Sequence, residues 1–279
     1  MLLLRRPLPW TLRTPATHRA LTTPVPTTSL HTDLVPELPG TVPPHHAYIF
    51  LHTAHPPSQY PAKFTTKVHR RLLLNAMRWG GAVNFAWDGQ GDSGAGDEAG
   101  GEQETYSLTA FSSARGKLEI RNVSLENVDD VARRLEVHTQ PQVTSSSSSS
   151  SDDIHLYVCT HGARDCRCGE TGGAVVRAIR DELRRRKERG AADPSGRVKL
   201  AEVAHVGGHK YAANVLVYPH GEWLGEVKPD NVREILDAIL GRPTRPMTDA
   251  ETPICPSHWR GRMGLTKEEQ VDLFTRLCS

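Results

Sequence analysis

Apolar positions recur along the chain with two periods, and the two periods alternate. Short, mainly apolar runs predict strands, whereas stretches with apolar residues three or four positions apart predict amphipathic helices. In the first half the expected strands are 47–53, 82–87, 106–113 and 117–124, and the expected helices are 67–79 and 126–137. In the second half they are strands 154–159, 198–206, 213–219 and 221–227, and helices 174–189 and 230–240. We expect Asp230 to cap the last of these helices.

The order strand, helix, three strands, helix therefore occurs twice. It predicts an α/β (α+β) fold of two thioredoxin-like units in tandem, with helices covering both faces of a small mixed sheet. His52 in the first unit takes the position of Cys159 in the second. Because a single histidine there is more readily explained as structural, we interpret the first unit as a degenerate repeat without ligands.

Two low-complexity segments interrupt the pattern. The acidic, glycine-rich stretch 89–104 reads as an insertion between strands, and a run of seven serines reads as a linker. After the second unit, Thr266 and Glu269 predict a capping box for a last helix, and the HWRG segment before it should pack an aromatic side chain on the body. The predicted organisation is 1–44 targeting or disordered segment, 45–138 degenerate thioredoxin-like domain, 139–153 linker, 154–245 ligand-bearing thioredoxin-like domain, and 246–279 tail with helix.

Charge and composition narrow the possible roles. The net charge of +2 does not favour nucleic-acid binding, and no apolar run reaches the roughly 18 residues of a membrane span. Before Asp33 the chain has no acidic residue but has several arginines, threonines and leucines, a composition typical of mitochondrial transit peptides. We expect mitochondrial localisation, in the matrix or intermembrane space, with a disordered basic tail and the cytosol as the alternative.

The stretch CTHGARDCRCG, residues 159–169, holds three of the five cysteines, and none precedes Cys159. This distribution argues against a secreted disulfide framework. Cys159 ends a predicted strand and Cys168 lies near a helix start, where the helix dipole and neighbouring arginines favour thiolates. Thiolates bind soft metals, but eight intervening residues fit a zinc finger poorly.

A second stretch, HVGGHKYAAN, supplies two further ligand candidates, His205 and His209. We expect Gly207 and Gly208 to let the backbone approach a bulky cofactor. Two cysteines on one loop and two histidines on another form a Cys2His2 set. Such a set suits a two-iron cluster, with thiolates on one iron and imidazoles on the other, as in Rieske centres.

Three stretches resemble the fungal sucrase/ferredoxin-like family. They are CTHGARDCRCG, the longer segment HVGGHKYAANVLVYPHGEWLGEV that contains both histidines, and HWRGRMGL near the end. The resemblance covers most of the chain after about residue 45. It implies a thioredoxin-like protein that binds a [2Fe-2S] cluster and transfers electrons in mitochondrial redox or thiol homeostasis. Carried over to this sequence, the family's ligands are Cys159, Cys168, His205 and His209.

Two other functions stay open at this point. The same four ligands can hold a structural zinc ion, and Cys166 with Cys168 can cycle as a thiol oxidoreductase. We interpret the chain as an electron-transfer protein rather than an enzyme with its own substrate, with an unknown redox protein as partner. The sequence assigns no role to Cys166, Cys255, Cys278 or His161, although His161 is expected near the cluster.

Overall fold

The computed structural model describes residues 38–89, 104–141, 152–190 and 193–278. The chain divides into a unit of Met1–Leu34, outside these residues, and a unit of Val35–Ser279, to which the description is confined. The predicted targeting segment, acidic insertion and polyserine linker lie wholly or mostly outside the described residues, so the predicted domain boundaries remain predictions.

The described elements follow the predicted order. The first half contains β1 (Ala47–His52), α1 (Lys67–Ala76), β2 (Gly81–Trp87), β3 (Tyr106–Ser112), β4 (Gly116–Val123) and α2 (Val128–His138). The second contains β5 (Ile154–Cys159), a π-helical turn (Cys168–Gly172), α3 (Gly173–Arg189), β6 (Val198–Val203), β7 (Val215–Tyr218), β8 (Glu222–Leu224) and α4 (Val232–Leu240). The chain then adds β9 (Trp259–Arg262), which the pattern did not predict, and α5 (Lys267–Cys278). The fold class is α/β, as predicted.

In the described part of the chain, nine strands form one sheet in the order β4-β3-β1-β2-β6-β5-β7-β8-β9. Each half contributes one parallel pair, β1 with β2 and β5 with β6, and its remaining pairs are antiparallel. The halves join through a short antiparallel contact, in which Ala86 pairs with Val203 and Trp87 with Glu202. The strand order of the first half is therefore mirrored in the second.

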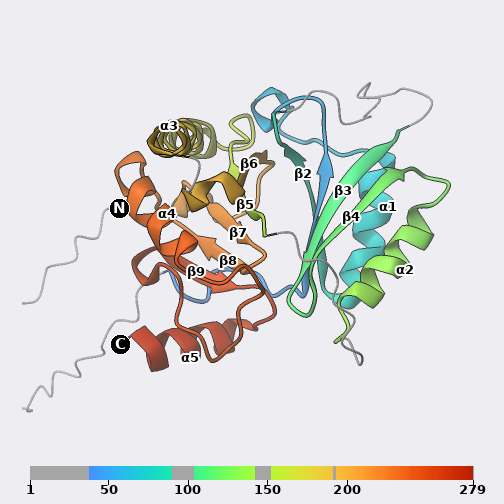
Figure 1. Cartoon of the computed structure of the whole chain (residues 1–279). Coiled ribbons are helices and arrows are strands. Elements are labelled where there is room, and N and C mark those ends of the chain that lie inside the picture. The colour runs from blue at the N-terminus through green and yellow to red at the C-terminus, as the bar shows by residue number, and fades with distance from the viewer. Residues whose placement is uncertain (1–37, 90–103, 142–151, 191–192, 279) are drawn as a thin grey trace, which may run out of the picture. The chain divides into compact units, whose positions relative to one another are not determined.

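In each half, the two helices of the repeated pattern lie on one face. In Figure 1, α1 and α2 lie together against β1–β4, and α3 and α4 lie beside β5–β8. Within β1, Ile49 and Leu51 pack in the core with α1 and α2, whereas Tyr48 and Phe50 belong to a different core. That second core joins residues of β1, β2 and β3 to residues of β5, β6, β7 and β8.

The expectation that helices cover both faces of a small mixed sheet in each unit is therefore wrong. The second face of each half packs against the other half, with Phe50 stacked on Tyr157 at 3.7 Å and Phe111 on Tyr218 at 4.6 Å between ring centroids. Such pairs contribute about 0.5–1.5 kcal/mol beyond the buried area. Burial on both faces explains why AYIFLH and IHLYVC read as nearly continuous apolar runs.

The two predicted helix caps differ in outcome. At α5, Thr266 N–H donates to Glu269 (2.7 Å) and Glu269 N–H donates to Thr266 Oγ1 (3.3 Å), so the capping box is confirmed. The prediction that Asp230 caps α4 is wrong. Asp230 lies inside a 3₁₀ turn, Pro229–Asn231, that precedes the helix, and the Asn231 side chain closes that turn by accepting from Lys228 N–H (3.2 Å).

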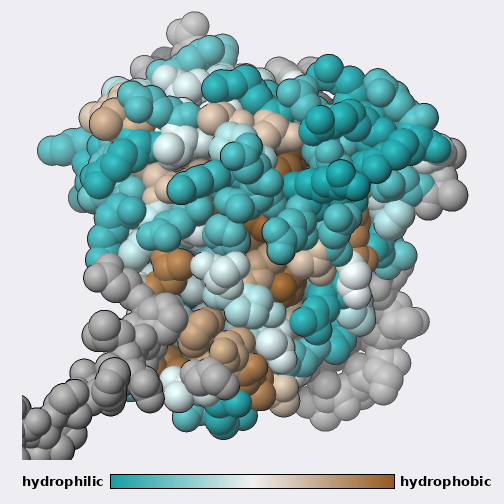
Figure 2. Space-filling model, turned by 90° about the vertical axis from the view of Figure 1, so that its left-hand side faces the viewer, coloured by the Kyte–Doolittle hydropathy of each residue, from teal (hydrophilic) through white to brown (hydrophobic). Residues whose placement is uncertain are grey.

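The HWRG segment packs as predicted, because Trp259 is fully buried and stacks on Phe274 of α5. The face turned toward the viewer in Figure 2 is mostly hydrophilic, with apolar side chains scattered over it. Among the described residues, no helix combines the length and apolar character that a bilayer crossing requires.

Candidate metal centre

The alternation of side chains along β5 sets the direction of Cys159. Leu156 and Val158 point into the core with α3 and α4, so Tyr157 and Cys159 point into the core between the two halves. Cys168, at the start of the π-helical turn, reaches the same core. Both thiols are fully buried.

Glycines allow the loop between these cysteines to close tightly. A Cβ on Gly169 would lie 2.8 Å from the Cα of Gly162, and a Cβ on Gly172 would lie 2.0 Å from the carbonyl oxygen of Cys159. Real side chains do not fit at such distances. The turn that carries Cys168 therefore approaches the end of β5 as closely as backbone permits.

His205 joins the two cysteines because β5 and β6 are parallel neighbours. Cys159 is in register with Val203, so the segment that follows β6 emerges beside Cys159. His205 Nδ1 lies 3.6 Å from Cys168 Sγ, and the ligand atoms of Cys159, Cys168 and His205 all lie within 4.8 Å of one another. Residues brought together in this way could hold one metal ion or one edge of a small cluster.

His209 lies next to this group rather than inside it. It begins a 3₁₀ turn (His209–Tyr211), and its ring centroid is 5.7 Å from that of His205. The side chain is 47% exposed, and its Nδ1 lies 3.7 Å from Oδ2 of Asp165, which belongs to the cysteine loop. Of the four predicted ligands, the structure therefore gathers three and places the fourth alongside.

The two buried thiols have opposite proton affinities. The pKa of Cys159 is lowered, mainly because the Cys168 thiol donates a hydrogen bond to its sulfur. The pKa of Cys168 is raised, because it is that donor and because burial opposes a second negative charge. The pair therefore loses one proton readily and retains the other unless a cation compensates it.

The remaining residues of the motif have separate roles. Cys166 is exposed, away from the buried face that Cys168 occupies. His161 is buried and its Nε2 lies 3.0 Å from the carbonyl oxygen of Pro61, so it links the site to the first half. Asp165 is held by a bidentate pair with Arg167 at 3.0 Å, which lowers the pKa of its carboxyl to about 2. His52, the counterpart of Cys159, lies 2.8 Å from the Thr109 hydroxyl.

Gly208 has a structural role that the sequence did not indicate. The atoms that a Cβ on Gly208 would meet belong to Arg260, whose Nη2 would lie 2.3 Å away, whereas Gly207 has open space around it. The glycine at 208 therefore makes room for a buried arginine of β9. Spacing of residues along the chain gave no sign of this arginine.

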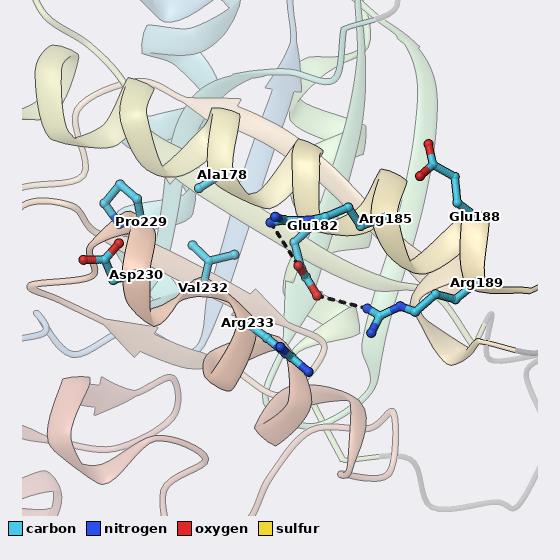
Figure 3. Close-up of a pocket in the computed structure, with 9 residues that line it drawn as sticks. All are labelled: Ala178, Glu182, Arg185, Glu188, Arg189, Pro229, Asp230, Val232 and Arg233. Carbon is cyan, nitrogen blue, oxygen red and sulfur yellow. Dashed lines mark hydrogen bonds and ion pairs between the residues drawn. The ribbon is translucent and has the colours of Figure 1, made fainter.

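Two cavities lined by described residues include none of the three ligands in their walls. One, of about 610 Å³, lies between α3 and the start of α4. Figure 3 shows the Glu182 carboxylate there between Arg185 and Arg189, with ion-pair distances of 3.1 and 3.2 Å. Another, of about 740 Å³, is lined by strands of both halves, including His52 and His155. In the first cavity, Glu182, Arg185 and Arg189 form a network of ion pairs rather than a metal site.

Two thiols and an imidazole within one small volume form a donor set for a soft or borderline metal. Zinc and iron–sulfur clusters both take thiolate and imidazole ligands. The residues present therefore fit a metal or cluster, and they lie in the α/β unit that β5–β8, α3 and α4 form.

Residues 38–261 match the sucrase/ferredoxin-like family, and the chain belongs to that family. Altered inheritance of mitochondria protein 32 of Meyerozyma guilliermondii is 35% identical over 104 residues, covering 36% of this chain and 34% of that protein. Actin patches distal protein 1 of Saccharomyces cerevisiae is 30% identical over 130 residues, covering 43% of this chain and 40% of that protein. The chain thus spans well under half the length of these relatives.

Among solved structures, the chain is similar to a thioredoxin-like [2Fe-2S] ferredoxin from Aquifex aeolicus. One structure of it shows 20% identity and a TM-score of 0.27, covering 32% of this chain and 82% of that one. The wild-type structure at 1.5 Å shows 22% identity and the same TM-score, covering 33% and 91%. These scores are too low to equate individual residues.

Proposed function

We propose that this protein is an electron-transfer protein whose [2Fe-2S] cluster is held by Cys159, Cys168, His205 and His209. The observation that carries the proposal is the convergence of two buried cysteines and one histidine from two loops, with ligand atoms within 4.8 Å. When bound, such a cluster supplies a one-electron couple. With two thiolates and two neutral imidazoles it is formally less negative than a four-cysteine cluster, so it accepts an electron more readily.

The position of His209 supports its role as the fourth ligand. A carboxylate beside one ring nitrogen of a metal-binding histidine orients the ring and leaves the other nitrogen for the metal. Asp165 lies 3.7 Å from Nδ1 of His209, so Nε2 is the nitrogen left for iron. Because Arg167 holds Asp165, the cysteine loop itself helps to orient this histidine.

We place this electron transfer in the mitochondrion, with a redox protein as partner. Relatives named for altered inheritance of mitochondria and an acid-free, arginine-containing N-terminal sequence support this location.

Anaerobic purification followed by iron, sulfide and zinc analysis tests the proposal. We expect visible absorption and two irons with two labile sulfides per chain. Replacing Cys159 or Cys168 with serine should remove most of the iron and colour. Cys166→Ser is the matched control, because Cys166 lies two positions from Cys168 but is exposed. This variant should retain both the iron and the colour.

The other outcomes identify the alternatives. A colourless protein with one zinc per chain would show that these residues hold a structural zinc ion instead of a cluster. Thiol-exchange activity that Cys166→Ser abolishes while the iron content stays unchanged would point to a thiol oxidoreductase instead.

A further inference from the structure

Arg260 in β9 is a buried cation beside the candidate metal centre. Its side chain is 1% exposed, and among the described residues no carboxylate lies within ion-pair distance of its guanidinium. Arg262, two positions along the same strand, is equally buried but is paired with Glu222 at 2.5 Å. A buried charge without a counter-ion is costly, so a compensating function is expected.

Hydrogen bonds connect Arg260 to both ligand-bearing segments through Asn214. The guanidinium donates to Asn214 Oδ1 (2.6 Å), and Asn214 Nδ2 donates to the carbonyl oxygen of Gly208 (3.1 Å), the residue before His209. The carbonyl oxygen of Asn214 accepts from the Cys159 N–H (3.1 Å). Two further bonds, to the hydroxyl (3.0 Å) and carbonyl (2.9 Å) of Thr41, fix the other side of the guanidinium.

The chain is shaped around this arginine. A Cβ on Gly208 would lie 2.3 Å from Nη2, and one on Gly225 would lie 2.6 Å from Cδ of Arg260. The Tyr211 ring lies 4.8 Å from the guanidinium carbon. The loop that carries the histidines therefore wraps around the guanidinium.

The positive charge also acts on the site. The Cys159 sulfur lies close enough to interact electrostatically with the guanidinium. Burial lowers the pKa of Arg260 to about 10, which still leaves it charged at neutral pH. Reduction adds one negative charge to a cluster held by Cys159, and a fixed buried cation favours that added charge.

We propose that Arg260 is a positioning residue of the cluster site: it holds the histidine loop through Asn214, and its uncompensated charge raises the reduction potential. This inference rests on the proposed function. The inference adds Arg260 to the site, although Arg260 makes no hydrogen bond to the sulfur or imidazole ligands.

The test uses the full-length, cluster-loaded protein and three variants. Arg260→Met removes charge and hydrogen bonds, and should weaken electron affinity about tenfold, a fall in potential of about 59 mV for one electron. Arg260→Lys keeps the charge but loses the planar fork, so it should release iron severalfold faster while its potential changes less than that of Arg260→Met. Arg262→Lys is the control with equal burial and a paired charge, and its potential should match the wild type.

Iron and sulfide are measured first, so that the two proposals fail separately. A wild-type protein without a cluster would refute the proposed function, and with it this role of Arg260. A wild-type protein with a cluster, and an Arg260→Met variant with unchanged potential, would overturn the charge effect alone. If Arg260→Met does not fold, Arg260→Lys decides: iron release at the wild-type rate would overturn the positioning role.

Discussion

At the scale of single residues, the surroundings in the folded protein distinguish residues of the same type that lie close together in the sequence. Cys166 and Cys168 are two positions apart, yet one is exposed and the other is buried against Cys159 and His205. Gly207 and Gly208 are adjacent and both have positive φ, at 84° and 63°, yet only Gly208 contacts Arg260. Neighbouring residues of the same type therefore make different contributions.

The two glycines provide a matched pair of variants. Alanine at either position carries the cost of the left-handed conformation, about 1–2 kcal/mol. Gly208→Ala also forces its Cβ into the Arg260 guanidinium, so we expect it to lower the free energy of unfolding by a further ~1–2 kcal/mol. Urea unfolding of both variants measures the difference. Equal losses would mean that the Gly208–Arg260 contact relaxes without cost.

At the scale of elements, the strands beside the junction between the halves are buried on both faces. Phe50 of β1 and Tyr157 of β5 stack across that junction, 107 positions apart in the numbering, and the same core contains Cys159 and Cys168. The first half thus forms one wall of the core in which the thiols lie. It has a structural role whether or not it carries ligands.

Removing one of these rings should be costly. We expect Phe50→Ala to lower the free energy of unfolding by about 3–5 kcal/mol, since the ring is fully buried and the cavity cannot collapse between the two packed halves of the sheet. Leu74→Ala on α1 is the control, because Leu74 is 55% exposed and should cost about 0.5 kcal/mol or less. Denaturant unfolding compares the two. A small loss for Phe50 would show that the halves do not depend on this junction.

At the scale of the whole molecule, buried and partly buried histidines outside the metal centre link stability to pH. Burial lowers the pKa of His45, His155 and His220 to about 4, against an ordinary value near 6.5. All three are neutral in the folded protein at neutral pH. In the unfolded chain they bind protons as the pH falls below about 6.5, which favours unfolding.

We therefore expect these histidines to leave the free energy of unfolding unchanged above about pH 6.5 and to lower it progressively as the pH falls toward 4. Each histidine contributes a slope of at most about 1.4 kcal/mol per pH unit in that range. Urea unfolding at pH 7, 6 and 5.5 measures the slope. His220→Asn removes one of the three groups and should reduce the slope by at most about 1.4 kcal/mol per pH unit. An unfolding free energy that stays constant from pH 7 to 5.5 would contradict the account.

The predictions made from the sequence succeeded where the information is local. Apolar spacing located the helices and most of the strands, and the Thr266–Glu269 pair located the start of α5. They failed where a short segment depends on what lies beside it. β9 is such a case, because Trp-Arg-Gly-Arg has no apolar alternation and forms a strand only by pairing with β8.

The sequence by itself determined the order of elements, the family and the ligand candidates, because periodicity and motif spacing depend on residues close together along the chain. Only the tertiary structure decided what covers the second face of the sheet in each half and which ligands converge. It alone brought Arg260 to Thr41, 219 positions away. Contacts at such separations depend on how the faces of distant strands pack, and side-chain spacing along one segment does not specify that packing.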